Sequence, residues 1–137
     1  MKFILVLVVS LMPNAVVANS EITDVLKNNI LNNLKYIQEE DADRSMSTMH
    51  SQSPAYLPTK NMLPQIFGSY KLSYELLSFK FIAYDGDLAY ARVKQSTKKI
   101  SGPAFRNNEI DMVQLFRKES GVWKLWAQVN IDIEYIN

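Results

Sequence analysis

Apolar residues in the first part of the chain recur every three or four positions. Between residues 20 and 40 they fall on one helical face, at Ile22, Val25, Leu26, Ile30, Leu34 and Ile37. This spacing is typical of an amphipathic α-helix. Ser20 can cap the helix, and Glu21 and Asp24 suit its positive N-terminal end. We therefore expect a helix over residues 20–40.

A short second helix is predicted directly after the first. Asp41 is placed to cap it, and the segment extends to about Met49. Met46 and Met49 are three positions apart, so both can face inward.

A third helical region is predicted around three prolines. Pro54 suggests its start, because proline is tolerated in a first turn. Pro58 and Pro64 interrupt the pattern, since a proline inside a helix removes a hydrogen bond and costs ~3 kcal/mol or more. We expect a broken or kinked helix that is most regular over residues 59–70.

After Tyr70 the pattern changes to that of β-strands. Strands are predicted at about residues 71–84, 88–101, 109–118 and 122–135. Turn residues separate them, most clearly Asp85, Gly86 and Asp87. Helices followed by consecutive hairpins predict an α+β fold, with the helices packed on one face of a four-stranded antiparallel sheet.

Side-chain alternation indicates how the sheet is shaped. The last strand alternates most clearly, and one predicted face holds Trp123, Leu125, Ala127, Val129, Ile131 and Ile133. In the first strand the alternation slips near Leu76 and Leu77, which indicates a β-bulge. Long strands with bulges curl. A curled sheet closed on one side by helices forms a cone, so we expect an enclosed cavity.

The N-terminus has the layout of a secretory signal peptide. Lys2 precedes an apolar run over residues 3–12, and small residues follow up to Ala18. The apolar run is shorter than the ~20 residues that span a bilayer, so a retained membrane anchor is the less favoured alternative. We expect cleavage after Ala18, export to the periplasm or the exterior, and a mature domain of 137 − 18 = 119 residues over 19–137.

Composition excludes several function classes. The chain has no Cys, which rules out disulfides and thiol catalysis, and a single His argues against a zinc site. The formal net charge is +1 and falls to 0 without Lys2, so the strongly basic footprint of a nucleic-acid binder is missing. Phosphate-binding loops, dinucleotide fingerprints and nucleophile elbows are absent from the sequence, and we expect no cofactor.

Three stretches carry a family resemblance. They are YIQEEDAD at residues 36–43, followed by Met46 and His50; DGDLAYARV at residues 85–93; and LFRKESGVWKL at residues 115–125. In this order, the chain resembles the nuclear transport factor 2-like superfamily, also called cystatin-like or SnoaL-like. The resemblance implies a conical pocket and, frequently, a homodimer formed through the sheet. It implies no activity, because members include isomerases, dehydratases, cyclases and non-catalytic binding domains.

Four residues are candidates for catalysis. Asp41 and Asp43 lie in the helical half, where a buried carboxylate can act as a base, although helix capping is the favoured interpretation of Asp41. His50 is the only histidine and can serve as a base near neutral pH or end a helix. Asp111 is a further carboxylate, in the predicted third strand.

Further polar and aromatic residues are candidates for binding. The predicted pocket residues are Tyr56, Tyr70, Tyr74, Arg92 and Gln114. Trp126 and Gln128 are predicted on the open face of the sheet, where a second subunit would cover so large a ring as that of Trp126.

The sequence is compatible with three functions. The leading hypothesis is an exported domain that binds a small molecule or a segment of a partner protein in its conical pocket. The second is an isomerase or dehydratase that uses a pocket carboxylate with His50. The third is a dimeric structural or interaction module. An enzyme needs at least two titratable groups that converge inside the pocket, whereas a binding domain needs an apolar cavity with one or two polar anchors.

Overall fold

A computed structural model describes the backbone of residues 14–137 and the side chains from residue 19 onward. The predicted signal peptide lies mostly outside the described residues and stays a prediction. Within the described part of the chain, no helix is both long and apolar enough to cross a membrane.

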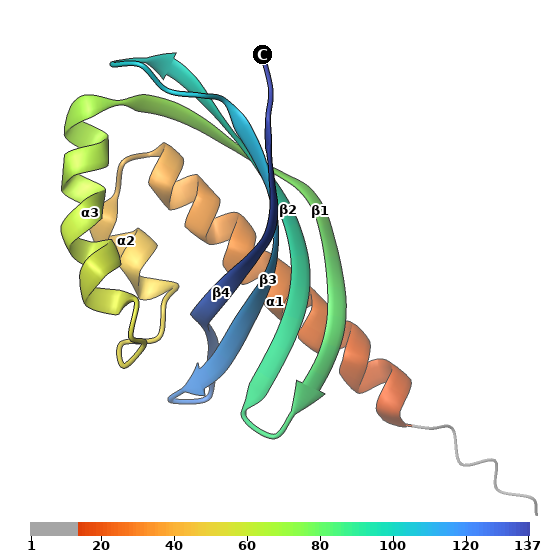
Figure 1. Ribbon diagram of the computed structural model, residues 1–137. Helices are drawn as coiled ribbons and strands as arrows, with labels where there is room; N and C mark the ends of the chain where they lie inside the picture. Colours follow the sequence, from red (N-terminus) through yellow and green to blue (C-terminus); the bar gives the residue numbers. More distant parts are fainter. Residues whose placement is uncertain (1–13) are drawn as a thin grey trace, which may run out of the picture.

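In residues 14–137, three helices precede four strands, and the sheet has the order β1-β2-β3-β4 with every neighbouring pair antiparallel (Figure 1). The elements are α1 (Asn14–Gln38), α2 (Ala42–Ser47), α3 (Tyr56–Ser69), β1 (Lys71–Asp85), β2 (Leu88–Ser101), β3 (Asn108–Glu119) and β4 (Val122–Tyr135). The predicted α+β fold class is confirmed.

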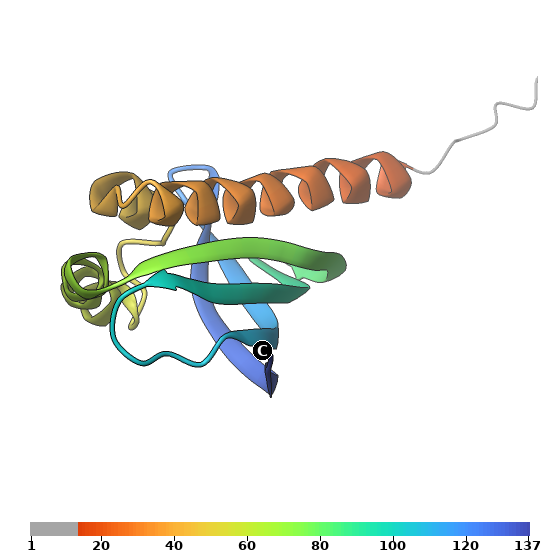
Figure 2. The same cartoon turned by 90° about the horizontal axis from the view of Figure 1, so that it is seen from above.

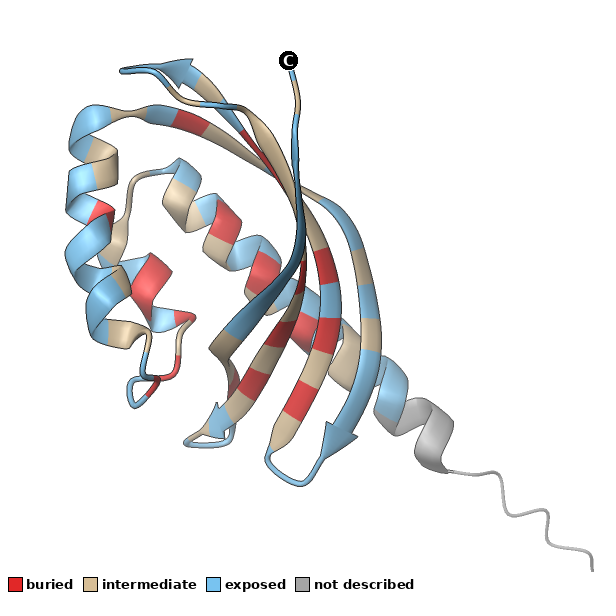
Figure 3. Ribbon diagram, in the orientation of Figure 1, coloured by how far each residue is buried: buried red, intermediate tan, exposed pale blue. Residues whose placement is uncertain are grey.

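The apolar face of α1 supplies much of the core. Leu26, Ile30 and Leu34 are buried, and α1 packs against β1 and β4. The facing sheet residues include Ala89 and Ala91, whose small side chains are completely buried in the same cluster. Buried residues therefore line the inner face of the sheet, which is the face turned toward α1 (Figure 3). The opposite face is called the outer face below.

The third helix is continuous from Tyr56 to Ser69, so the break that was one of the two expectations, a broken or a kinked helix, does not occur. Pro58 lies in the first turn, where backbone N–H groups have no partner within the helix. Pro64 lies inside the helix, but Pro64 and Lys60 are both exposed. Water can therefore bond the Lys60 carbonyl that Pro64 leaves without a helical donor.

Bulges bend the sheet into a cone. The β1–β2 register shifts between Leu76 and Ser78 and again between Phe81 and Ala83, so Leu77 and Ile82 are extra residues. The first shift confirms the slip predicted at Leu76 and Leu77. Figure 2 shows the strands curving away from α1, with α3 closing one end of the curve.

Two more bulges reverse the predicted alternation of β4. The β3–β4 register shifts at Trp126 and again at Ile131. Beyond the first shift, Gln128 pairs with buried Gln114 and lies on the inner face, while Val129 is 59% exposed on the outer face. The single alternating face predicted for the last strand is therefore wrong, because each extra residue moves the following side chains to the opposite face.

Candidate ligand-binding cavity

The mouth of the cone holds a cavity of about 410 Å³. It lies between the three helices and the inner face of the sheet, and it is within the size range of small-molecule sites. Its apolar wall includes Leu34, Ile37, Met46, Met49, Leu63 and Ile66. Its polar wall includes Asn33, Thr59, Tyr74, Gln95, Gln114 and Gln128.

The short second helix brings methionine to the apolar wall. Asp41 caps this helix by accepting a hydrogen bond of 2.9 Å from the backbone N–H of Arg44. Met46 is buried, and Met49 follows the helix where the chain pairs in parallel with Leu125 of β4. Methionine is flexible and polarisable, so this part of the wall can adapt to apolar ligands of different shape.

Two asparagines of α1 donate hydrogen bonds to residues 45–48, at the end of α2. Asn29 Nδ2 donates to the carbonyl oxygens of Thr48 and Trp123, at 3.1 and 3.2 Å. Asn33 Nδ2 donates to the hydroxyl oxygens of Thr48 and Ser45, at 2.8 and 3.2 Å. These contacts hold α1, the α2 segment and β4 together around one side of the cavity.

Gln114 has the most buried carboxamide of the wall, with 6% of the residue exposed. Its Nε2 lies 3.4 Å from Gln128 Oε1 and 3.5 Å from Met112 Sδ. Its Oε1 is one of three buried side-chain polar atoms without a hydrogen-bond partner among the described residues. Leaving a buried acceptor without a partner costs about 1–3 kcal/mol.

Tyr74 is the only titratable residue among the described residues that line the cavity. Burial raises the pKa of its phenol, and the negative charge of Glu40 raises it further. The phenol is therefore neutral at physiological pH. The cavity wall thus consists of apolar side chains, hydroxyl groups and neutral carboxamides.

None of the four predicted catalytic residues lines the cavity. The Asp41 carboxylate accepts hydrogen bonds from the backbone N–H and from the guanidinium of Arg44. The backbone bond lowers the pKa of Asp41 most, and the guanidinium bond lowers it further. Asp43 is exposed in the first turn of α2. Asp111 forms a bidentate ion pair with Arg92, with N–O distances of 3.0 and 2.7 Å, and this pair lowers the pKa of Asp111.

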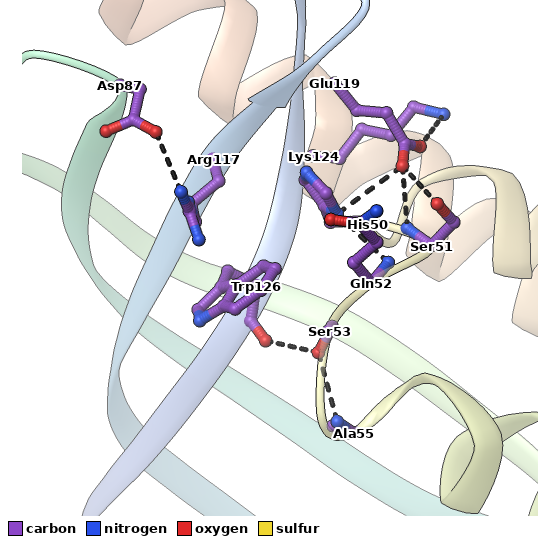
Figure 4. A network of polar contacts seen from close by, with 10 residues as sticks. All are labelled: His50, Ser51, Gln52, Ser53, Ala55, Asp87, Arg117, Glu119, Lys124 and Trp126. Carbon is purple, nitrogen blue, oxygen red and sulfur yellow. Dashed lines mark hydrogen bonds and ion pairs between the residues drawn. The ribbon is translucent and has the colours of Figure 1, made fainter.

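His50 belongs instead to a polar network beside the cavity (Figure 4). Its Nδ1 accepts a hydrogen bond of 3.1 Å from the Gln52 N–H and lies 3.4 Å from a Glu119 oxygen. The hydroxyl of Ser51 donates to the same oxygen, and Lys124 donates to the other at 3.1 Å. These two hydrogen bonds lower the pKa of Glu119 to about 2. The network joins the loop after α2 to the β3–β4 turn.

Two of the five predicted pocket residues line the cavity, namely Tyr74 and Gln114. Tyr70 packs edge-on against Phe105 with ring centres 5.9 Å apart, and Arg92 pairs with Asp111 on the outer face. Tyr56 opens α3 and does not line the cavity.

Both predicted dimer residues border the cavity. The Trp126 ring lies edge-on to His50, with centres 5.0 Å apart, and the guanidinium of Arg117 lies over it at 4.6 Å. Gln128 points to Gln114 across the inner face. Asn33, Thr59 and Gln95 also belong to the polar wall, and none of the three was predicted from the sequence. Gln95 is two and four positions after the buried residues Val93 and Ala91, so the alternation of β2 predicts that Gln95 faces the inner side of the sheet.

The curved sheet closed by helices defines this chain as a protein of the nuclear transport factor 2-like, or cystatin-like, fold. Three solved structures share it. A candidate aromatic ring hydroxylase from Novosphingobium aromaticivorans is 12% identical, with 85% of this chain and 94% of that chain covered and a TM-score of 0.67. A candidate dehydratase of the NTF2-like family from Streptomyces avermitilis is 12% identical, with 80% and 94% covered and a TM-score of 0.65. An uncharacterised cystatin-like protein from Caulobacter vibrioides is 15% identical, with 85% and 91% covered and a TM-score of 0.65.

Sequence comparison places the chain more narrowly. Residues 28–136 match the family model described as the C-terminal domain of anti-sigma-I factor RsgI9, and the chain belongs to that family. A search of curated proteins finds no match to this sequence.

Proposed function

We propose that this domain binds an uncharged, mostly apolar small molecule in the 410 Å³ cavity and does not transform it. The observation that carries the proposal is the chemistry of the wall. Apolar side chains form most of it, and its polar groups are neutral carboxamides and hydroxyls. Burying an unpaired charge there would be costly, so the wall favours uncharged ligands.

The positions of the acidic residues support binding over catalysis. Proton transfer in an isomerase or dehydratase requires a base within hydrogen-bond reach of the substrate. The carboxylates of Asp41 and Asp111 bond arginines outside the cavity, and His50 accepts a backbone N–H in the adjacent network. The family name also refers to a domain of an anti-sigma factor, which is a regulatory protein, and a ligand-sensing domain suits such a protein.

Fluorescence titration with N-phenyl-1-naphthylamine, an uncharged apolar probe, tests this function. We expect saturable binding, at least about tenfold tighter than that of anionic 8-anilinonaphthalene-1-sulfonate, because the described wall residues include no cation to pair with a sulfonate. A Leu63→Trp variant fills part of the cavity and should weaken binding, since Leu63 is a buried lining residue.

The matched control is Leu57→Trp, which places the same ring on α3 at a position that is 66% exposed. Circular dichroism checks that both variants are folded. Equal probe affinity in folded Leu63→Trp and Leu57→Trp would place the binding elsewhere, and no saturable binding to the wild type would refute the function.

We further propose that two copies associate through the outer faces of their sheets. The outer face includes Val113, Leu115 and Val129, and the helices cover only the inner face. Its charges are of both signs, as in the ion pairs of Arg92 with Asp111 and of Lys94 with Glu109. A face of mixed charge can meet its own copy with opposite charges set against each other, which favours a homodimer over a partner of one charge sign.

Val129→Lys tests the dimer more cleanly than a change at Trp126, because Trp126 also contacts His50 and borders the cavity. We expect sedimentation equilibrium to show a shift from dimer to monomer for Val129→Lys. The control variant Leu57→Lys adds the same charge on exposed α3 and should remain dimeric. A monomeric wild type would refute this proposal.

Export is proposed from the N-terminal sequence pattern alone. If residues 1–18 act as a signal peptide, intact-mass analysis of protein from the exported fraction should give a chain that begins at Asn19. A chain that retains Met1 or Lys2 would contradict cleavage.

A further inference from the structure

We infer that Gln114 selects ligands that present a hydrogen-bond donor, such as an alcohol or an amide N–H, over ligands that end in an acceptor alone. This inference rests on the proposed function, because it assigns the polar contact within the same cavity. Its basis is that the two ends of this buried carboxamide differ: the nitrogen has partners in the protein and the oxygen has none among the described residues.

The nitrogen end of Gln114 is already engaged by the protein. Nε2 faces Gln128 Oε1 at 3.4 Å and Met112 Sδ at 3.5 Å. Gln128 in turn donates through its own Nε2 to Asn130 Oδ1 at 3.3 Å. The three amides therefore form a chain with one direction of donation.

Met112 sets that direction. A thioether sulfur can accept a hydrogen bond but cannot donate one. Because Met112 is 2% exposed, its sulfur stays against the carboxamide, and the amino end of Gln114 is the end that suits it. Reversing the carboxamide would place an acceptor against this sulfur.

The oxygen end of Gln114 is left without a donor. Oε1 is buried and lacks a partner among the described residues, although the side chain forms part of the cavity wall. The terminal torsion of a glutamine is broad, so a small rotation can turn Oε1 toward a ligand. A ligand hydroxyl or N–H then satisfies an acceptor that the protein leaves unpaired, whereas an ether or carbonyl oxygen does not.

The experiment compares 1-decanol with 1-methoxynonane, which have equal numbers of heavy atoms and differ in the donor. Each competes with bound N-phenyl-1-naphthylamine. For the wild type we expect about tenfold tighter binding of decanol, the preference that one hydrogen bond to a buried acceptor gives. In Gln114→Met, a side chain of similar shape whose thioether is only a weak acceptor, the two affinities should agree within about twofold.

Two further variants locate the effect. Gln65→Met is an exposed control on α3 away from the cavity and should keep the wild-type preference. Gln95→Met removes another carboxamide of the wall. Loss of the preference in Gln95→Met, with retention in Gln114→Met, would overturn the assignment to Gln114.

The outcomes separate this inference from the proposed function. If the probe binds in a Leu63-dependent manner but wild-type protein binds decanol and 1-methoxynonane equally, the cavity binds ligands and the inference about Gln114 is refuted. If the probe does not bind at all, the proposed function is refuted, and the inference about Gln114, which rests on it, is refuted with it. The wild-type comparison decides the matter even if Gln114→Met fails to fold, and Gln114→Leu provides a second substitution.

Discussion

Substitution of Asn29 is the most direct test of the hydrogen bonds that connect α1 to the α2 segment and to the sheet. Its Nδ2 donates to Thr48 O and Trp123 O, so one side chain connects α1 with the α2 segment and with β4. Asn29→Ala removes both hydrogen bonds at once. The Thr48 carbonyl keeps a second donor, the backbone N–H of Leu125 at 3.0 Å, so the structure should lose stability without losing its topology.

The magnitude follows from the contacts. Two hydrogen bonds in a partly buried site contribute about 1–3 kcal/mol together. Alanine is the better helix former, which returns about 0.5 kcal/mol. We therefore expect Asn29→Ala to lower the free energy of unfolding by about 0.5–2.5 kcal/mol and the melting temperature by about 2–12 °C for a domain of this size.

Urea unfolding followed by circular dichroism measures the effect. The control is Asn28→Ala, because Asn28 is the exposed neighbour on the same helix and undergoes the same change in helix propensity. This control should be slightly more stable than the wild type, by about 0.5 kcal/mol. The reasoning is refuted if Asn29→Ala and Asn28→Ala have equal stability.

Two further predictions concern the β3–β4 turn network and the loop after β2. The folded-state pKa of Glu119 is about 2, below the ordinary 4.5, so its stabilisation is complete above about pH 4.5 and is lost as the pH falls toward 2. Glu119→Gln should therefore be less stable than the wild type at pH 7 in thermal melts, and the two should converge near pH 2; a constant difference would contradict this. Gly102 has a φ of +124°, and an added Cβ would lie 2.7 Å from the Ser69 carbonyl oxygen. Gly102→Ala should therefore cost about 1–3 kcal/mol in urea unfolding, whereas Gly68→Ala, in open space on α3, should stabilise by about 0.5–1 kcal/mol.

The nature and order of the elements could be predicted from the sequence because their causes are local. The spacing of Leu26, Ile30 and Leu34 defines the buried face of α1, and these residues are buried as expected. Gly86 allows the positive φ of 58° in the turn between β1 and β2. The element boundaries were less accurate, since α1 begins at Asn14 rather than Ser20, and α3 begins at Tyr56, two residues after the Pro54 that suggests its start.

The composition of the cavity depended on the tertiary structure. Strand alternation has a period of two, so one extra residue moves every later side chain to the other face. The bulge at Trp126 moved Gln128 from a predicted interface to the cavity wall, where it meets Gln114. Whether a strand bulges depends on how far the sheet must curve to pack on its helices, and no local pattern in β4 encodes that.

The sequence by itself determined that this is an α+β chain with an amphipathic helix, long antiparallel strands and no cysteine. Only the tertiary structure decided which polar residues enclose the cavity and which leave it. Asp111 found its arginine partner, Arg92, outside the cavity, while Gln114 was left in the wall with an oxygen that has no partner among the described residues. The physical reason is that burial and hydrogen-bond pairing arise between residues distant in the chain, at Gln114 through the register of β3 with β4.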